Sequence, residues 1–302
     1  MPCASESSTA SDSAAKPPSI GLGILSWRAH KTLLASLETH RAGELFSLFD
    51  DCVIFFQEIE NEDRVFARQF GLRAEGDKTN LGIMGGMKKI AELLNTDYVL
   101  HLENDFRLIV DHQTAQRQIT TAVANMESRD AKFYRMAEGR PPIGDISELE
   151  KYSRYHPGSL LNRADSFSRK LRRFLRPAKA RRLIGGSIYA DANPHLLFPR
   201  HIHKTNDGHL IVDSAVLNWT NRAPFYPRHW FLEKIIPYAE ANPSSRTVNG
   251  KPDLEKELNC RWWRNQSYLT GACDKGLFGH ERLDRPENDE KGGHCRPVHA
   301  KT

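Results

Sequence analysis

Residues 20–110 alternate between apolar runs and amphipathic stretches. The apolar runs at 20–27, 52–56 and 98–102, and a shorter one at 72–75, are typical of buried strands. Apolar residues at helical spacing predict helices at 31–39, at 62–70, and from the turn at 80–86 to about Leu94. Strands that alternate with helices predict an α/β fold with a mostly parallel sheet, right-handed crossovers and helices on its faces.

The pattern is less regular in the rest of the chain. A helix is predicted at 114–126, a strand at 132–136 and a later helix at 229–236. Residues 138–185 lose periodicity, which indicates an insertion or a flexible flap. Four histidines, at 195, 201, 203 and 209, have no Cys or acid at zinc-site spacing, so we expect them to alternate, exposed, along a strand.

Composition is that of one soluble domain. The chain has 302 residues, of which 39% are hydrophobic and 27% charged, the usual balance of a globular protein. No run approaches the roughly 18 apolar residues of a membrane helix, and the first residues lack a secretory signal pattern. Residues 1–18 and 286–302 are expected to be disordered tails around a domain at 19–285. The 5 scattered cysteines indicate free thiols in a reducing compartment, so we expect a cytoplasmic protein.

The net charge of +5 is unevenly placed, and its densest block is Arg169–Arg182. Leu171, Phe174, Leu175 and Ala178 recur there at helical spacing. A basic amphipathic helix can lie on an anionic membrane surface, or it can cap the fold with its apolar side while its charges stay in solvent. No recognised nucleic-acid-binding motif accompanies the charge, so we expect no nucleic-acid partner.

Two carboxylates flank an amide where the strand at 98–102 ends, in Glu103-Asn104-Asp105. Ligands of open α/β sheets bind beyond the carboxyl ends of strands. Paired carboxylates there suit a hard divalent cation and a phosphorylated ligand, and the alternative is a strand that runs into a polar turn.

The turn Asn80–Gly86 has neither the GxGxxG spacing of a dinucleotide fold nor the Lys-Ser/Thr of a P-loop. It is therefore either a place where the backbone closely approaches a ligand or a plain loop.

Four features of the first half occur in an order that resembles family 2-type glycosyltransferases of the GT-A fold. They are Ile24-Leu25-Ser26-Trp27, a helix at 32–37, Asn80-Leu81-Gly82 and Leu102-Glu103-Asn104-Asp105. The likeness covers residues 20–110. It implies that the nucleotide base binds where the first strand ends, and that the acid-x-acid motif holds a nucleotide-sugar and a divalent metal. Because Glu103 replaces the usual first Asp, the resemblance makes Asp105 the expected metal ligand and places Glu103 at the ribose or at a metal-bound water.

The resemblance also implies a division of the domain and a set of site residues. Residues 19–112 would form the nucleotide-sugar-binding half, and 113–285 the acceptor half, with a basic insertion at 138–185. The implied nucleotide-sugar-binding residues are Ser26, Trp27, Glu58, Asn80, Gly82, Glu103 and Asn104. The implied ligands of Mn²⁺ or Mg²⁺ are Asp105, Glu103 and His280, and the alternative for His280 is a satisfied surface histidine.

Three acids alternate at 253, 255 and 257, so one or two of them are expected to point to solvent. In the resembling family an acid at the start of this late helix is the general base that deprotonates the acceptor hydroxyl. That role falls to Glu255, with Asp253 as the second candidate; the alternative is a solvated acidic helix start.

An aromatic ring lies among amides at Asn218, Trp219 and Asn221. This arrangement suits either a sugar-binding surface or a buried Trp beside a polar turn.

These features predict a metal-dependent, inverting glycosyltransferase that moves a sugar from a nucleotide-sugar to a glycan or glycolipid hydroxyl. One alternative is a sugar-phosphate nucleotidyltransferase, which normally has a Gly-rich basic loop after the first strand. This chain has Ser26-Trp27-Arg28-Ala29-His30 there. The other alternative is a non-enzymatic membrane-surface or carbohydrate-binding protein. Peripheral contact with the inner face of a membrane is expected to use Arg169–Arg182.

Overall fold

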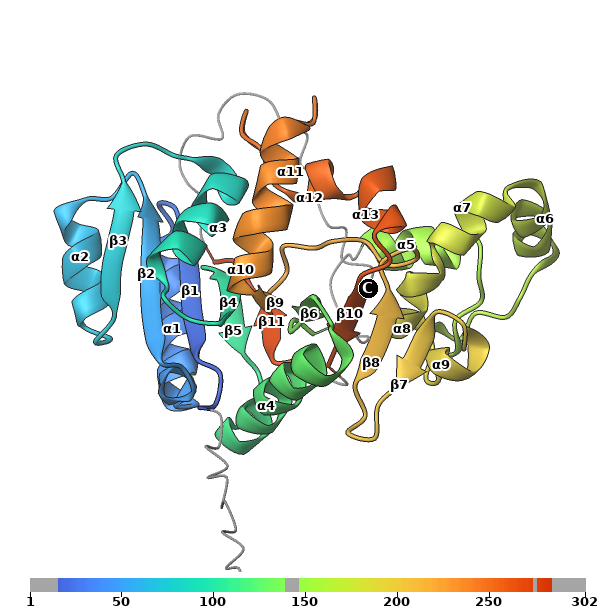
Figure 1. The fold of residues 1–302 in the computed structure, drawn as a ribbon, viewed down its shortest axis with the longest axis horizontal. Coiled ribbons are helices and arrows are strands. Elements are labelled where there is room, and N and C mark those ends of the chain that lie inside the picture. Colours follow the sequence, from blue (N-terminus) through green and yellow to red (C-terminus); the bar gives the residue numbers. More distant parts are fainter. Residues whose placement is uncertain (1–15, 139–146, 274–275, 284–302) are drawn as a thin grey trace, which may run out of the picture.

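A computed structural model describes residues 16–138, 147–273 and 276–283 (Figure 1). The tails predicted at 1–18 and 286–302 lie outside these residues, apart from 16–18. Within the described ranges, no helix has the length and apolar character needed to cross a membrane. Cys52 and Cys260 carry free thiols, as predicted, whereas Cys3 and Cys295 lie outside the described residues.

Four parallel strands form the first half of a 9-stranded sheet, where the sequence predicts strands. They are β1 (Ile20–Ser26), β2 (Asp51–Gln57), β3 (Arg73–Asp77) and β4 (Tyr98–Glu103), in the order β3-β2-β1-β4. The helices that connect them are α1 (His30–Ala42), α2 (Asn61–Arg68) and α3 (Gly82–Leu93). The carboxyl ends of these strands lie along one edge of the sheet, where ligands of such folds bind. The α/β prediction is confirmed.

The second half of the sheet is mixed, and the sequence analysis predicted strands at only two of its five places, 132–136 and the histidine segment. From β4 outward the strands are β9 (Pro224–Pro227), β6 (Phe133–Arg135), β10 (Leu269–Ala272), β8 (Leu210–Asp213) and β7 (Ile202–Lys204). The pair β6–β10 is parallel and the other pairs are antiparallel. β5 (Phe106–Leu108) and β11 (Phe278–His280) form a separate antiparallel pair.

Helices cover both faces of the parallel strands, because successive side chains of a strand point to opposite sides. Leu22 and Ile24 of β1 belong to a core shared with α1, α2 and α4, whereas Leu25 belongs to a core shared with α3. Gly23 lets α3 lie close to the sheet, since a Cβ atom there would be 2.0 Å from Cγ2 of Ile90. The remaining helices of these two cores are α4 (His112–Arg129), α10 (Arg228–Trp230), a π-turn (Phe231–Ile235), α11 (Ile236–Ala241), α12 (Glu255–Leu258) and α13 (Arg261–Asn265).

The region predicted to be a flap is helical where the structure describes it. Three helices lie within 138–185, namely α5 (Ser147–Ser153), α6 (Phe167–Leu175) and α7 (Pro177–Arg182). Pro177 separates α6 from α7, because a proline inside a helix removes a backbone hydrogen bond. These helices confirm the helical spacing predicted within Arg169–Arg182. None of the residues of α6 is buried, so it adds no residue to the core, and the assignment of 138–185 as an insertion or flap stays a prediction. Figure 1 shows α6 and α7 at one end of the molecule and α2 at the other.

The predicted histidine-bearing strand is confirmed only for β7, where His203 is exposed. Of the four histidines, His203 is in β7, His195 is in α9 (Pro194–Leu197), and His209 is buried. β7 ends because the chain turns back at Gly208, whose φ of +88° favours glycine. The other short elements are α8 (Ser187–Ala190) and the 3₁₀ turns Leu45–Leu48, Ser159–Leu161 and Ile184–Gly186.

Candidate active site

Asp105 and His280 meet beyond the carboxyl end of β4. Asp105 lies in the turn between β4 and β5, and His280 ends β11, which pairs with β5. Asp105 Oδ2 lies 3.0 Å from His280 Nε2. This hydrogen bond raises the pKa of His280, because the carboxylate stabilises the charged ring. The structure thus brings together two residues that the resemblance implies as metal ligands.

One oxygen of Asp105 is buried without a partner. The residue is 3% exposed, and its Oδ1 atom accepts no hydrogen bond from the described chain. Such an atom is costly unless a cation or a water completes its contacts. In the described ranges, no set of three or more His, Cys, Asp and Glu side chains is arranged to hold a metal. Mg²⁺ typically has one or two carboxylate ligands, waters and substrate phosphates, so Asp105 and His280 fit a cation that is shared with a diphosphate.

Glu103, at the end of β4, lies in the electrostatic field of this pair. Burial, together with the negative charges of Asp105 and Glu255, raises its pKa to about 8. Its carboxyl group is therefore largely protonated at neutral pH when no cation is near. A cation bound at Asp105 would favour the ionised form. Its role toward a metal or a ribose stays a prediction.

Trp27 and Glu58 join the loops that follow β1 and β2. Trp27 Nε1 donates a hydrogen bond of 2.9 Å to Glu58 Oε2, which also lies 2.7 Å from a guanidinium nitrogen of Arg28. The backbone φ angles of Arg28 and Glu58 are +48° and +58°, a strained conformation that tends to occur at functional sites. Ser26 is buried before this loop, and its Oγ atom has no partner in the described chain. These residues form the candidate binding site for the nucleotide base.

Asn80 and Gly82 build the start of α3. Asn80 Oδ1 accepts a hydrogen bond from the Gly82 N–H at 2.8 Å, and Gln57 Nε2 donates to the Gly82 carbonyl at 2.8 Å. The φ of Gly82 is +75°, and a Cβ atom there would lie 2.5 Å from Cβ of Lys251. The glycine therefore permits close approach of another chain segment, in contrast to the ligand suggested by the sequence. Nucleotide binding by these two residues stays a prediction, as it does for Asn104.

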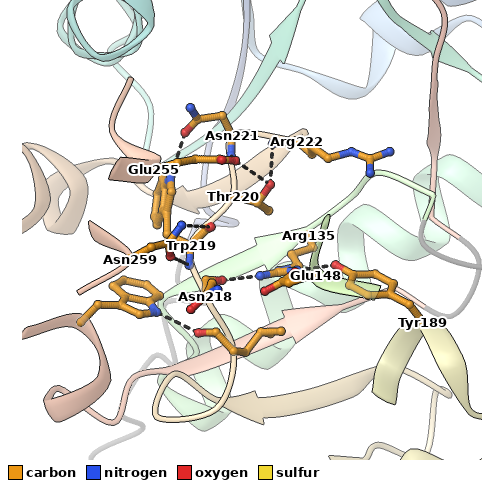
Figure 2. A network of polar contacts seen from close by, with 12 residues as sticks. Arg135, Glu148, Tyr189, Asn218, Trp219, Thr220, Asn221, Arg222, Glu255 and Asn259 are labelled. Carbon is orange, nitrogen blue, oxygen red and sulfur yellow. Dashed lines mark hydrogen bonds and ion pairs between the residues drawn. The ribbon is translucent and has the colours of Figure 1, made fainter. Parts of the chain in front are cut away.

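The two base candidates have different surroundings. Glu255 begins α12 and lines a cavity, and its Oε1 accepts hydrogen bonds from Thr220 Oγ1 (3.1 Å) and the Asn221 N–H (2.9 Å) (Figure 2). Asp253 is buried, and its two carboxylate oxygens bind Lys256, one at the backbone N–H (2.8 Å) and one at Nζ (2.9 Å). Asp253 therefore holds the start of α12, and Glu255 is the better placed of the two to accept a proton.

The prediction that one or two acids of this segment point to solvent is wrong. Asp253 and Glu257 are buried, and Glu255 is half-buried. The reasoning assumed one continuous helix, but α12 has only 4 residues. Leu254, just before it, has a φ of +70° and is buried, so the acids are not tied to the faces of one helix.

Trp219 belongs to the core, so the prediction of a sugar-stacking ring is wrong. It is 1% exposed, and Phe133 and Phe231 stack on it with ring centroids 4.4 and 6.1 Å away. Trp219 Nε1 donates to Asn221 Oδ1 at 2.9 Å, and Asn221 Nδ2 donates to the Asp253 carbonyl. The buried tryptophan beside a polar turn, the alternative at this position, is what the structure shows.

A cavity of about 480 Å³ lies beside Glu255 and Asn218. It reaches Arg135, which ends β6 and is buried. Arg135 forms an ion pair of 2.8 Å with Glu148 of α5 and donates hydrogen bonds to the Tyr189 hydroxyl and the Asn218 carbonyl (Figure 2). The sequence analysis missed this network. Its one signal was an arginine inside the apolar strand segment 132–136.

Comparisons with known proteins found similarity in structure and none in sequence. No protein-family model matches the chain, and no curated protein matches it. Staphylococcus aureus TarS 1–349 overlaps with a TM-score of 0.47 at 9% identity, over 86% of this chain and 59% of that one. Mycobacterium tuberculosis glucosyl-3-phosphoglycerate synthase, crystallised with Mn²⁺ and UDP, overlaps with a TM-score of 0.45 at 10% identity, over 89% and 73%.

Rubrobacter xylanophilus mannosyl-3-phosphoglycerate synthase overlaps with a TM-score of 0.35 at 16% identity, over 44% of each chain. The chain spans 59% of TarS 1–349, less than two thirds of it. TM-scores below 0.5 do not decide the reaction of this chain, which must be judged from its own residues. The solved structures named here are GT-A-type glycosyltransferases, the group that the sequence resembles.

Proposed function

We propose that the protein is a glycosyltransferase that moves a sugar from a nucleotide-sugar to an acceptor hydroxyl. The observation that supports this most directly is the Asp105–His280 pair beyond β4, with one buried carboxylate oxygen left unpartnered. Together these residues would hold a divalent cation, which would neutralise the charge of the departing diphosphate. Trp27, fixed by Glu58, offers a ring at the end of β1 for the nucleotide base.

Glu255 is the proposed general base. It lines the cavity, and its hydrogen bonds from Thr220 and Asn221 both end on Oε1. These bonds orient the carboxylate and leave Oε2 to take the proton of an acceptor hydroxyl. A base on the acceptor side deprotonates the attacking oxygen for in-line displacement, which supports inversion at the anomeric carbon.

Binding of nucleoside diphosphates with and without Mn²⁺ tests the proposal. A thermal-shift screen finds the base that binds, because a ligand of the folded state raises the melting temperature, and calorimetry then gives its affinity. We expect Mn²⁺ to strengthen binding to the wild type and to have little effect on Asp105→Asn. The control is Asp207→Asn, an exposed carboxylate in the turn after β7. Equal Mn²⁺ dependence in wild type and Asp105→Asn contradicts the proposed site.

A second observation supports membrane contact. α6 turns its apolar side away from the protein, with Phe167 and Phe174 80% and 81% exposed. Arg169 and Arg173 of the same helix donate hydrogen bonds to backbone carbonyls of the protein. A helix that capped the fold, the alternative for this block, would bury these rings. Exposed cations that flank them, among them Lys170, suit an anionic lipid surface.

Vesicle co-sedimentation tests this contact. The double variant Phe167→Ser/Phe174→Ser is expected to bind vesicles of phosphatidylserine in phosphatidylcholine more weakly than the wild type. Val65→Ser is the matched control, because Val65 is also exposed but belongs to α2 at the opposite end of the molecule (Figure 1). Unchanged binding of the double variant contradicts the assignment of α6.

A further inference from the structure

The cavity beside Glu255 has a strongly basic wall. Its lining contains 8 Lys or Arg side chains and 3 Glu side chains. Arg135 is paired with Glu148, and Lys256 with Asp253. The other cations make no ion pair with the described residues; they are Lys151, Lys179, Arg182, Arg222, Arg246 and Arg264. A wall with this surplus of positive charge attracts anions.

Two of these cations, Arg182 and Arg264, oppose one another. Arg182 lies in α7 and Arg264 in α13, so the fold brings them to one cavity from distant parts of the chain. Burial lowers the pKa of Arg264, and the positive charge of Arg182 lowers it further. The two positive charges repel each other, and a bound anion would offset this repulsion. Guanidinium groups match phosphate oxygens with paired hydrogen bonds.

The inner wall of the cavity also contains a buried hydrogen-bond donor without a partner in the described chain. Arg135 is 3% exposed, and its Nε atom has no hydrogen-bond partner in the described chain. A buried donor of this kind is usually satisfied by water or by a ligand. Four of the six cations come from α5, α7 and α13, and the other two, Arg222 and Arg246, come from loops. The candidate cation site comes from the β4–β5 turn and β11. The charge of Arg222 in the wall acts to lower the pKa of His280, and that of Glu255 acts to raise the pKa of Glu103, so the cavity borders the candidate cation site. An anion held by the helical part of the wall would therefore bind beside the diphosphate at Asp105.

We propose that the acceptor carries a phosphate group, and that Arg182 and Arg264 bind this group in the cavity that contains Glu255. The inference rests on the proposed glycosyl transfer and specifies its acceptor. The phosphate anchors the acceptor, while Glu255 takes the proton from one of its hydroxyls. A neutral acceptor would add no counter-charge to the six cations that form no ion pair with the described residues.

Calorimetric titration with inorganic phosphate tests the site. The protein is first saturated with Mn²⁺ and the nucleoside diphosphate that it binds, so that only a separate phosphate site can respond. We expect Arg182→Gln and Arg264→Gln each to weaken phosphate binding by about tenfold, the loss of one charge-assisted contact. Arg181→Gln is the matched control, because Arg181 is exposed in the same helix and does not line the cavity.

The outcomes separate this inference from the proposed function. If the diphosphate binds but phosphate does not, or if both variants bind phosphate as the wild type does, the phosphate site is wrong. Failure of any nucleoside diphosphate to bind with Mn²⁺ counts instead against glycosyl transfer.

A vesicle arm identifies the source of the phosphate. It compares phosphatidic acid in phosphatidylcholine with phosphatidylcholine alone. Weaker vesicle binding by Arg182→Gln and Arg264→Gln, but not by the control, supports the proposed site and indicates that its phosphate belongs to a lipid. If the two variants bind vesicles as the wild type does but bind inorganic phosphate more weakly, the proposed site is supported and its acceptor is a soluble molecule.

Discussion

Asp105 Oδ2 lies 3.0 Å from His280 Nε2, although the two residues come from opposite halves of the chain. The contact depends on the small sheet of β5 and β11, in which His280 is paired with Phe106. A hydrogen bond from the Glu281 N–H to the Asp105 carbonyl (2.9 Å) fixes the same crossing. The candidate cation site is therefore assembled by backbone pairing as well as by its two side chains.

Replacing His280 tests whether it shares a cation with Asp105. His280→Gln removes the imidazole and keeps a polar side chain of similar reach. We expect the Mn²⁺-dependent part of nucleoside diphosphate affinity, measured by calorimetry, to fall by about tenfold or more, because one of two protein ligands is lost. His229→Gln, at an exposed histidine of α10, serves as the control. The same Mn²⁺ dependence in His280→Gln and wild type would remove His280 from the site.

Glu255 and Asp253 are expected to respond differently to amide substitution. Glu255→Gln should lower turnover of the nucleotide-sugar by a factor of about 10² to 10⁴, with nucleotide affinity unchanged, because a positioned base is lost. Asp253→Asn should keep most of its turnover and lose about 1 kcal/mol of stability, because it weakens the bonds at the start of α12. Release of nucleoside diphosphate and urea unfolding measure the two effects. The reverse pattern would make Asp253 the base.

Trp219 should report on the core. Trp219→Ala is expected to lower the free energy of unfolding by about 3–5 kcal/mol, because a fully buried ring is removed. Trp262→Ala should cost less, since that ring is only half-buried where it stacks on Tyr238. Urea denaturation compares the two. A small loss for Trp219→Ala, combined with weaker sugar binding, would restore the sugar-surface assignment.

His101 is a buried, unsatisfied polar side chain inside β4 that lowers the stability of the fold. Neither ring nitrogen has a partner in the described chain, and burial lowers its pKa to about 3. We expect His101→Leu to raise the free energy of unfolding by about 1–3 kcal/mol at pH 7.5, because an unsatisfied polar ring is replaced by an apolar side chain.

The same variant should change the pH dependence of stability. Below its unfolded pKa of 6.5, His101 takes up a proton only when the chain unfolds. It therefore contributes a loss of about 1.4 kcal/mol per pH unit as the pH falls from 6.5 toward 3. Urea unfolding at several pH values should show a slope shallower by that amount in His101→Leu. His40, whose pKa burial lowers to about 4, adds the same kind of slope to both proteins. Parallel curves would contradict the neutral state of His101.

Gly82 and Gly208 form a matched pair of glycines. Both have positive φ, +75° and +88°, but a Cβ atom at Gly82 would clash with Lys251, whereas nothing lies within 4 Å at Gly208. Gly208→Ala should therefore lose only the cost of the backbone conformation, about 1 kcal/mol. Gly82→Ala should lose more stability, as well as turnover, because the clash displaces the segment that leads to Glu255. Equal losses in thermal unfolding would show that this packing is unimportant.

The parallel half of the fold is readable from sequence because its signals are local. β1 and β2 contain continuous apolar runs, the run in β4 is interrupted only by His101, and α1 to α3 repeat apolar residues at helical spacing. β8, β9 and β10 are only 4 residues long, and β9 begins and ends with proline. Such strands are defined by their partners, which a single sequence does not reveal.

The site divides in the same way. Asp105 and Glu255 could be nominated because acids at the end of a strand and at the start of a late helix match a known order of motifs. The burial of Trp219 could not be foreseen, because it depends on Phe133 and Phe231 from other parts of the chain. Arg182 and Arg264 likewise become neighbours only through the packing of α7 and α13 around one cavity.

The pairing of β5 with β11 also sets an order of events during synthesis. The ribosome delivers Asp105 early and His280 late, because translation runs from the N-terminus. A nascent chain that has already folded its parallel strands still lacks half of the proposed cation clasp. The proposed cation site would then be complete only after β11 has been translated, and chains that stop before Phe278 would fold in part but lack His280.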